Sequence, residues 1–340
     1  MENTKRYGQE PLVAGFKGIE VTIHWVRFVL PFHDPVIAME LIGIERSEFH
    51  YVQRHRLEGE RTWSDYQHWY ESRHGRIYFD PRGKQRILVE MTGQECEEFE
   101  AKCGPTEWIA LIRRVNAARG KWRRIDLAAD DKSGQVTHAR VIGCLEANAF
   151  RMRFKSWGKR ERHPGGTTIY LGSEGSSFFI RMYDKRQEIM SRLGHKSDGP
   201  WFRTEIQARA QYAASIARLI DQAGSLGIGA GIVKHYVTFL KPSKTDTNTS
   251  RWTEARWWGR WLADVEKVSI SPQRKGGTMF ATIERWLERQ AGPAMALVLK
   301  ERGRHALIAM AERSLPRLKA KHLKLIGNPQ VDLMKAPDSA

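Results

Sequence analysis

A tyrosine and two carboxylates lie on separate predicted strands of this 340-residue chain, and these residue types can cut a phosphodiester. Tyr183, Asp126 and Glu205 each belong to a run in which apolar and polar residues alternate, a pattern typical of a β-strand. In each run the alternation places the residue on the polar face of its strand. If the three strands are neighbours in one sheet, the three side chains converge on a single exposed sheet surface. This surface is the predicted site.

Basic residues around Tyr183 decide whether its hydroxyl can act as a nucleophile. A tyrosine hydroxyl has a reference pKa of about 10, so it is a poor nucleophile at neutral pH unless a cation stabilises the phenolate. Arg181 and Arg203 are within reach by strand alternation, and Lys185 by the turn that follows Tyr183. A nicking enzyme that works through a covalent phosphotyrosine needs this set of residues.

The carboxylates suggest a divalent metal ion, Mg²⁺ or Mn²⁺, because such ions prefer hard oxygen ligands and polarise a phosphate. Asp126 and Glu205 are the predicted ligands, with Asp130 or Asp131 as a third. Two structural interpretations stay open beside this one. Tyr183 could be a half-buried packing residue, and Asp126 could form a cross-strand ion pair with Arg203. The sequence contains no Walker loop, H-E-x-x-H, Cys/His zinc spacing or G-x-S-x-G.

The overall charge points to a polyanionic partner. The formal net charge is +17 at pH 7, which fits DNA, RNA or an anionic membrane surface. No apolar run reaches membrane-spanning length, and the start of the chain lacks the apolar region of a signal peptide. Three cysteines show no C-x-x-C spacing. We therefore expect a cytoplasmic protein that does not bind a membrane.

The densest basic stretch runs from residue 151 to 162, and aromatic residues alternate through it. A surface that contacts phosphates and also stacks bases needs basic and aromatic residues side by side. A solvated strand and loop is an equally good interpretation of this stretch. Arg203 is a further predicted DNA-binding residue. The others predicted to bind DNA are Arg151, Arg153, Lys155, Trp157, Lys159 and Arg160.

The order of predicted elements favours an α+β fold with a helical C-terminal region. Alternating segments mark strands at 18–32, 67–91, 123–131, 168–183 and 201–209, and helical patterns lie between and after them. Four tryptophans between 252 and 261 are expected to fill a core, and no internal repeat is evident. The predicted layout is a lead-in (1–17), a core (18–241), a linker (242–250), a helical region (251–325) and a disordered tail (326–340).

Four stretches together resemble the Rep_trans family of rolling-circle replication initiators. They are 91–100, Arg124 to Asp131 (R-I-D-L-A-A-D-D), 169–173 continuing to Ile180–Lys185 (I-R-M-Y-D-K) with Glu188, and Arg203–Glu205 (R-T-E). Their order and spacing match over roughly 15–240. The resemblance implies a relative of the HUH-nuclease sheet, antiparallel or mixed, with flanking helices. No His-x-His pair is present, so the metal would rest mainly on carboxylates.

The same resemblance implies a role for each matching residue. Tyr183 would be the nicking nucleophile, Lys185 its cationic helper, and Asp126 and Glu205 the metal-site carboxylates. One departure stands at His24 and Trp25, where the family is expected to carry Asp-Trp. Either His24 replaces the acidic group near the metal, or that position is not essential in this chain.

The implied reaction is transesterification at a double-stranded plus-strand origin. It leaves a 5′-phosphotyrosine on the nicked single strand and a 3′-OH that primes a host polymerase, with a host helicase as a further partner. Because only one tyrosine stands in the motif, termination would use a second subunit of a homodimer. The alternatives are a relaxase of an integrative conjugative element, although no helix-turn-helix domain fits into the first seventeen residues, and a DNA-binding regulator without catalysis. An RNA-binding protein would not account for the carboxylates.

Overall fold

The computed structural model describes residues 19–54, 66–162, 166–194, 198–243, 245–263, 265–270, 284 and 286–318. The chain forms two compact units, Met1–Pro272 and Gln273–Ala340. The predicted lead-in and tail lie outside the described residues. The boundaries predicted at 241 and 250 stay a prediction, and the first compact unit continues past them to Pro272.

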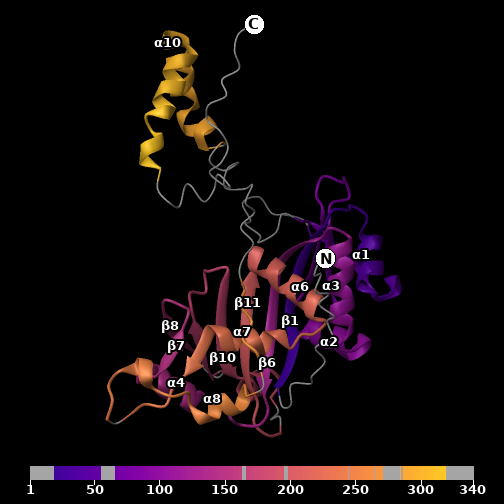
Figure 1. The fold of residues 1–340 in the computed structure, drawn as a ribbon. Coiled ribbons are helices and arrows are strands. Elements are labelled where there is room, and N and C mark those ends of the chain that lie inside the picture. The colour runs from indigo at the N-terminus through magenta and orange to yellow at the C-terminus, as the bar shows by residue number, and fades with distance from the viewer. Residues whose placement is uncertain are drawn as a thin grey trace, which may run out of the picture. The chain divides into compact units, whose positions relative to one another are not determined.

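One large sheet organises the first unit (Figure 1). It has ten strands in the order β2-β3-β4-β5-β1-β6-β11-β10-β9-β8, and all of the pairings between them are antiparallel. The strands are β1 (Ile19–Leu30), β2 (His50–Gln53), β3 (His68–Ser72), β4 (Gly75–Phe79), β5 (Ile87–Met91), β6 (Lys121–Asp131), β8 (Trp157–Arg162), β9 (Gly166–Leu171), β10 (Phe178–Asp184) and β11 (Phe202–Arg209). A separate two-stranded sheet pairs β7 (Phe150–Met152) with β12 (Val237–Phe239). The predicted α+β class with an antiparallel or mixed sheet is confirmed, and the sheet is antiparallel.

Helices flank this sheet at the positions that the sequence patterns indicate. They are α1 (Pro35–Ile42), α2 (Gly93–Cys103), α3 (Glu107–Ala117), α4 (His138–Glu146), α5 (Lys185–Leu193), α6 (Gln211–Ala223), α7 (Ile228–Tyr236) and α8 (Arg256–Trp261). Two helix starts matter for the site. Thr92 and Glu95 form a capping box that begins α2, and the Asp184 side chain accepts hydrogen bonds from the backbone N–H groups of Arg186 and Gln187 to begin α5.

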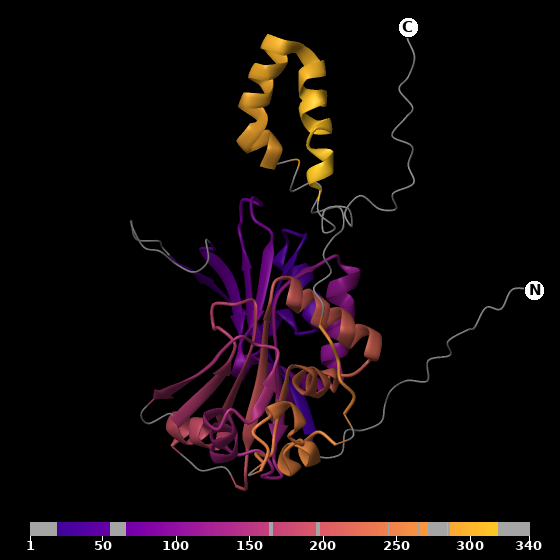
Figure 2. The ribbon, with the colours of Figure 1, turned by 60° about the vertical axis from the view of Figure 1, so that its left-hand side comes forward.

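The two faces of the sheet differ in chemistry. Ile125, Leu127 and Ile206 on one face are fully buried, and α6 and α7 pack on the strands β6 and β11 that carry them (Figure 2). Gly229 lets α7 approach closely, because a Cβ there would lie 2.9 Å from Val21 Cγ1. The opposite face carries arginines, carboxylates and Tyr183, as the alternation predicts.

The sheet consists of two halves with the same strand order. Counted from the centre, one half runs β1-β5-β4-β3-β2 and the other runs β6-β11-β10-β9-β8. From the centre of the sheet outward, each half therefore has the first of its strands in the chain, then the last, and then the remaining strands in reverse chain order to the edge. The antiparallel β1–β6 pair joins the two halves. The expectation that the chain has no internal repeat is therefore wrong at the level of topology. The sequence does not reveal the duplication, because too few residues match between the two halves.

The remaining elements are simpler. Trp258 and Trp261 are buried in the core of the first unit, which confirms the packing role expected for the tryptophan cluster. In the second unit a π-helical turn (Leu287–Ala291) leads into α10 (Gly292–Glu312), which is broken at Gly303, where φ is +75°. No helix in the described part of the chain is long and apolar enough to cross a membrane.

Candidate active site

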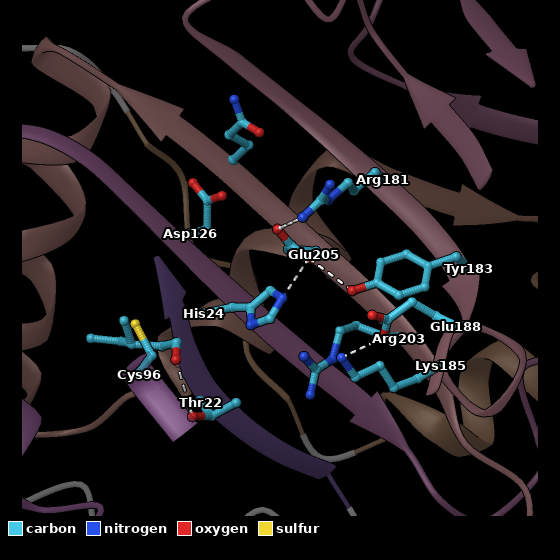
Figure 3. A network of polar contacts seen from close by, with 12 residues as sticks. Thr22, His24, Cys96, Asp126, Arg181, Tyr183, Lys185, Glu188, Arg203 and Glu205 are labelled. Carbon is cyan, nitrogen blue, oxygen red and sulfur yellow. Dashed lines mark hydrogen bonds and ion pairs between the residues drawn. The ribbon is translucent and has the colours of Figure 1, made fainter. Parts of the chain in front are cut away.

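Strands β10 and β11 bring Tyr183 against a carboxylate and between two arginines. Their register pairs Arg181 with Glu205 and Tyr183 with Arg203. The Tyr183 hydroxyl donates to Glu205 Oε2 over 3.1 Å, and Arg181 Nη2 donates to the other oxygen of that carboxylate (Figure 3). Tyr183 and Glu205, predicted to converge from separate strands, are therefore in direct contact.

A buried ion pair holds the second arginine. Arg203 Nε and Nη2 donate to the two oxygens of Asp130 over 2.7 Å each. This pairing, rather than the cross-strand pair considered for Asp126 and Arg203, follows from the register of β11 on β6. Both side chains are almost fully buried, at 3% and 2% exposed.

The predicted exposure of this surface is wrong. Asp126 and Glu205 have no exposed area, and Tyr183 is only 8% exposed. The charged side chains shield one another by pairing. Lys185 is also buried, and its Nζ lies 2.6 Å from Glu188 on α5 and 3.8 Å from Glu97 on α2, which links the two helices beside the site.

Two buried guanidinium nitrogens in the site have no hydrogen-bond acceptor in the described part of the chain. Among the described residues, neither Nη1 of Arg203 nor Nε of Arg181 has a hydrogen-bond partner, although both are buried. A buried donor without an acceptor costs free energy, so such groups mark a place where a ligand oxygen or water completes the structure. The two arginines lie on either side of the Tyr183–Glu205 contact.

A bulge in β1 turns His24 into the site. The pairing of β1 with β6 shifts register between Ile23 and Trp25, so His24 faces the polar side of the sheet. Its Nε2 atom lies 3.9 Å from Glu205 Oε2. Burial lowers the pKa of His24 to about 4, against the opposing charge of Glu205, so the imidazole is neutral at pH 7. Gly93 makes room for the ring, because a Cβ at that position would lie 2.4 Å from His24 Cε1.

Asp126 lies nearby but has its own partner. Both of its oxygens accept hydrogen bonds from Arg124, over 2.9 and 3.1 Å from Nε, and Arg124 also donates to Gln207. Burial raises the pKa of Asp126, and Arg124 opposes that change. For Glu205, burial would raise the pKa, but the charge and hydrogen bond of Arg181, with the charge of Arg203, outweigh it and lower the pKa below its usual range.

The residues present fit a divalent cation only in part. No group of three or more His, Cys, Asp or Glu residues in the described ranges is arranged to hold a metal. His24 and Glu205 nevertheless lie close enough to share one ion, since two ligands each about 2.1 Å from a metal can be up to about 4 Å apart. Asp126 would have to leave Arg124 to join them, and Arg203 holds both oxygens of Asp130.

The residues predicted to bind DNA in the basic stretch occupy varied positions. Arg151 donates to the carbonyls of Ser250 and Trp252, and Arg153 donates to that of His235, so both tie backbone segments together. Lys159 and Arg160 form surface ion pairs, with Glu146 and Glu174 respectively. Lys155 and Trp157 line an open groove of about 620 Å³ with Phe150 and Phe154. Their DNA contacts stay a prediction.

Sequence reasoning missed several residues that shape this site. Arg124 and Gln207 determine where Asp126 points, and Gly93 determines where His24 can lie. Arg124 stands two residues before Asp126 on the same strand face, so the alternation contained a signal for that pair. The bulge at His24 and the approach of α2 have no such signal, because both depend on contacts between distant parts of the chain.

Comparisons with known proteins agree with the fold and identify the family. Residues 120–313 match the family described as Replication initiation factor, Rep_trans. Residues 20–114 match the N-terminal domain of Rolling Circle replication initiation proteins. The chain therefore belongs to the Rep_trans replication initiation factor family, as its motifs suggested.

Two individual proteins show the same relationship. The "Putative DNA relaxase NicK" of Bacillus subtilis (strain 168) is 25% identical over 237 residues, a match that covers 66% of this chain and 66% of that relative. The solved structure of a Rolling Circle Replication Initiator Protein from Geobacillus stearothermophilus is 26% identical with a TM-score of 0.61. That match covers 75% of this chain and all of the solved chain.

Proposed function

We propose that this protein nicks one strand of DNA at a replication origin by transesterification at Tyr183. The observation that carries the proposal is the position of the Tyr183 hydroxyl beside two arginines that each keep a buried N–H without a protein partner in the described ranges. The non-bridging oxygens of a phosphodiester would supply the missing acceptors and bring the phosphorus to the hydroxyl.

The reaction follows from this arrangement. Oη of Tyr183 attacks the phosphorus, the Oη–P bond forms and the P–O3′ bond breaks, which leaves a 5′-phosphotyrosine and a free 3′-OH. The hydroxyl proton of Tyr183 is already directed at Glu205, which makes that carboxylate the first acceptor. The departing O3′ takes up a proton from water. Arg181 and Arg203 offset the charge that gathers on the phosphate.

The resting tyrosine is protonated. Burial raises the pKa of Tyr183 well above 10, and the neighbouring Glu205 charge raises it further. Activation therefore has to accompany substrate binding. A divalent cation held by His24 and Glu205 would stabilise the phenolate and polarise the phosphate. A mixed nitrogen and oxygen ligand pair suits Mn²⁺ better than Mg²⁺, which prefers oxygen ligands.

Several partners belong to the same proposal. The free 3′-OH would prime a host polymerase, and a host helicase would separate the strands. A second subunit of a homodimer would supply the second tyrosine needed for termination. The positive net charge of +17 supports binding to origin DNA.

A relaxase of an integrative conjugative element is the second candidate. The observation that favours it is the similarity to the Bacillus subtilis relaxase NicK. The chemistry at Tyr183 would be the same in both cases, and only the fate of the nicked strand would differ. Transfer of a plasmid carrying the nick site into recipient cells separates this role from plasmid replication within one cell.

The test uses supercoiled DNA carrying the candidate origin, with Mg²⁺ or Mn²⁺, and compares wild type with Tyr183→Phe. We expect nicking that requires the metal and a protein–DNA adduct on a denaturing gel, both lost in the variant. Tight binding without nick or adduct would instead support a non-catalytic origin-binding regulator. Nicking that survives in Tyr183→Phe would keep the activity but overturn the assignment of the nucleophile.

A further inference from the structure

The two halves of the sheet share residues as well as strand order. In the C-terminal half, Arg181 on β10 faces Glu205 on β11, and Tyr183 follows two residues after Arg181. In the N-terminal half, Arg76 on β4 faces Glu90 on β5, and Tyr78 follows two residues after Arg76. β4 and β5 hold the same places in their half as β10 and β11 do in theirs. The two family matches also divide between 114 and 120, where the two halves meet.

Both tyrosines lie on the same face of the sheet. Cross-strand partners share a face, so the pairs Glu90–Arg27, Arg27–Arg124 and Asp126–Gln207 trace one continuous polar face from β5 to β11. From Tyr78 on β4 to Tyr183 on β10 there are five strand steps. At about 4.8 Å per step the two tyrosines are about 24 Å apart across the face.

Two of the cations beside Tyr183, Arg203 and Lys185, have no cationic counterpart at the matching positions of the N-terminal copy. Leu88 is the cross-strand partner of Tyr78, whereas Arg203 is that of Tyr183. Asp80 stands two residues after Tyr78, where Lys185 stands after Tyr183. Burial, together with the charge of Glu90, raises the pKa of Tyr78 to about 12. Because Leu88 and Asp80 replace Arg203 and Lys185, the N-terminal copy is not built to form a phosphotyrosine.

What the N-terminal copy does present is aromatic rings beside arginines. Trp69 Nε1 donates to Glu71 over 3.0 Å, which fixes a half-buried ring 5.9 Å from that of Tyr78. Trp25 Nε1 donates to Glu90 over 3.2 Å, and the Arg124 guanidinium stacks on its ring at 3.9 Å. Fixed rings of this kind give bases a surface to stack on at little entropic cost.

The two arginines of this copy are partly open to solvent. The side chains of Arg27 and Arg76 are 28% and 32% exposed. Arg27 pairs with Glu90, and Arg76 lies 3.4 Å from Glu71 and 3.2 Å from Glu95. Because a guanidinium has five N–H donors, a partly exposed arginine can add a phosphate contact while it keeps its carboxylate partner. Rings for bases and arginines for phosphates together match single-stranded DNA better than duplex DNA, whose bases are already stacked.

We propose that the N-terminal half carries a non-cleaving copy of the site, which binds a single-stranded DNA segment next to the strand cut at Tyr183. Trp69 and Trp25 stack with bases, and Arg76 and Arg27 contact phosphates. The nicked strand is thus held at two places on one sheet face. This inference deepens the proposed nicking function and rests on it, because that function supplies the single strand.

The test measures binding of a fluorescein-labelled oligothymidylate of about 20 nucleotides, long enough to cover both halves, by fluorescence anisotropy. Trp69→Ala should weaken binding about tenfold, as expected for loss of one base stack, and Trp69→Phe should restore most of it. Tyr51→Ala is the matched control, because Tyr51 is an exposed aromatic residue of the neighbouring strand β2 on the opposite face. It should bind like wild type.

A second variant keeps the test independent of any folding defect at Trp69. Arg76→Gln removes one predicted phosphate contact from a partly exposed side chain, so the slope of log K against log salt should fall by about 0.7. Wild-type affinity in Trp69→Ala together with an unchanged slope in Arg76→Gln would overturn the proposal. Equal weakening on a duplex of the same length would also overturn it, in favour of a duplex-binding surface.

The binding assay needs no cleavage, so the two proposals can fail separately. If Trp69→Ala binds normally while the Tyr183 adduct forms, the nicking function stands and the second binding site is wrong. If no adduct forms on any origin DNA but Trp69→Ala weakens single-strand binding, the stacking surface stands and it serves a protein that does not cut.

Discussion

The two halves of the sheet present the same tyrosine, arginine and glutamate in different electrostatic surroundings. In the C-terminal half, Tyr183 donates to Glu205 and has Arg181 and Arg203 beside it. In the N-terminal half, Tyr78 has Leu88 as its cross-strand partner. Both tyrosines are buried and both have a raised pKa, so burial alone does not distinguish them.

The difference lies in the cations and in their unused donors. Arg203 keeps its position because Asp130 neutralises it from β6, and it still has one N–H without a partner among the described residues. Asp130 stands on the polar face of β6, and the hydrophobic Val29 holds the matching place on β1, opposite Leu88. The buried Arg203–Asp130 ion pair therefore distinguishes the two sites. The site at Tyr183 could stabilise a phosphorane-like transition state, whereas the N-terminal copy could only bind DNA.

The largest expected effect is the contrast between the two tyrosines in the nicking reaction. Tyr183→Phe should abolish the covalent adduct, because the variant has no oxygen to attack phosphorus. Tyr78→Phe should form the adduct at a rate within about threefold of wild type, since Leu88 and Asp80 stand where Arg203 and Lys185 flank Tyr183. Gel analysis of labelled DNA checks both. An adduct lost in Tyr78→Phe would mean that the halves share the chemistry.

The two glutamates should differ nearly as much. Glu205→Gln removes the proton acceptor and the charge that fixes Arg181, so single-turnover nicking should slow by about 10³-fold. Glu90→Gln, at the matching position, should change that rate by less than about threefold when DNA is saturating. Quenched-flow or manual time courses on origin DNA would measure both rates. Equal losses would contradict the separation of roles between the halves.

Ion pairs in the two halves should also contribute differently to stability. Asp130→Asn leaves Arg203 charged and buried with a weaker partner, which should lower the free energy of unfolding by about 3 kcal/mol. Glu71→Gln breaks a pair in which both side chains are 32% exposed, so the loss should be under about 1 kcal/mol. Urea denaturation followed by circular dichroism gives both values. A cost for Glu71→Gln as large as that for Asp130→Asn would show that exposure does not set these energies.

The alternation of residue types was sufficient to predict most of the strands and their faces. Strands β6, β10 and β11 lie side by side, and Tyr183 meets Glu205 as the pattern indicated. These features depend on short-range periodicity, which a sequence shows directly. The expectation of an exposed site was wrong for a physical reason. Polarity marks a face, but it does not reveal that ion pairs such as Arg203–Asp130 allow that face to be buried.

Other features depend on contacts between segments far apart in the chain. The duplication is carried by strand order and by few residues, so no repeat is visible in the sequence itself. The position of His24 depends on a bulge in β1 and on a glycine of α2, almost seventy residues later. Neither Asp130 nor Asp126 could be assigned as a metal ligand from its type alone, because each has a neighbouring arginine as partner.

The smallest expected effect tests the contact between α2 and His24, both in the N-terminal half, because this contact determines how His24 reaches Glu205 in the C-terminal half. Gly93→Ala places a Cβ only 2.4 Å from the present position of His24 Cε1, so the ring must move away from Glu205. Nicking should fall about tenfold, as expected for a misplaced site residue. The backbone at Gly93 has no positive φ, so the melting temperature should change little.

Gly143→Ala is the control for this substitution, because no atom lies within 4 Å of a Cβ built there and Gly143 is also in a helix, α4. It should nick like wild type and melt slightly higher, since alanine favours a helix. His24→Ala should lose about as much activity as Gly93→Ala, and the double variant should lose no more than either single one. Additive losses would mean that Gly93 acts on the site by another route. Normal nicking in Gly93→Ala would show that the N-terminal half affects the reaction at Tyr183 only by binding DNA.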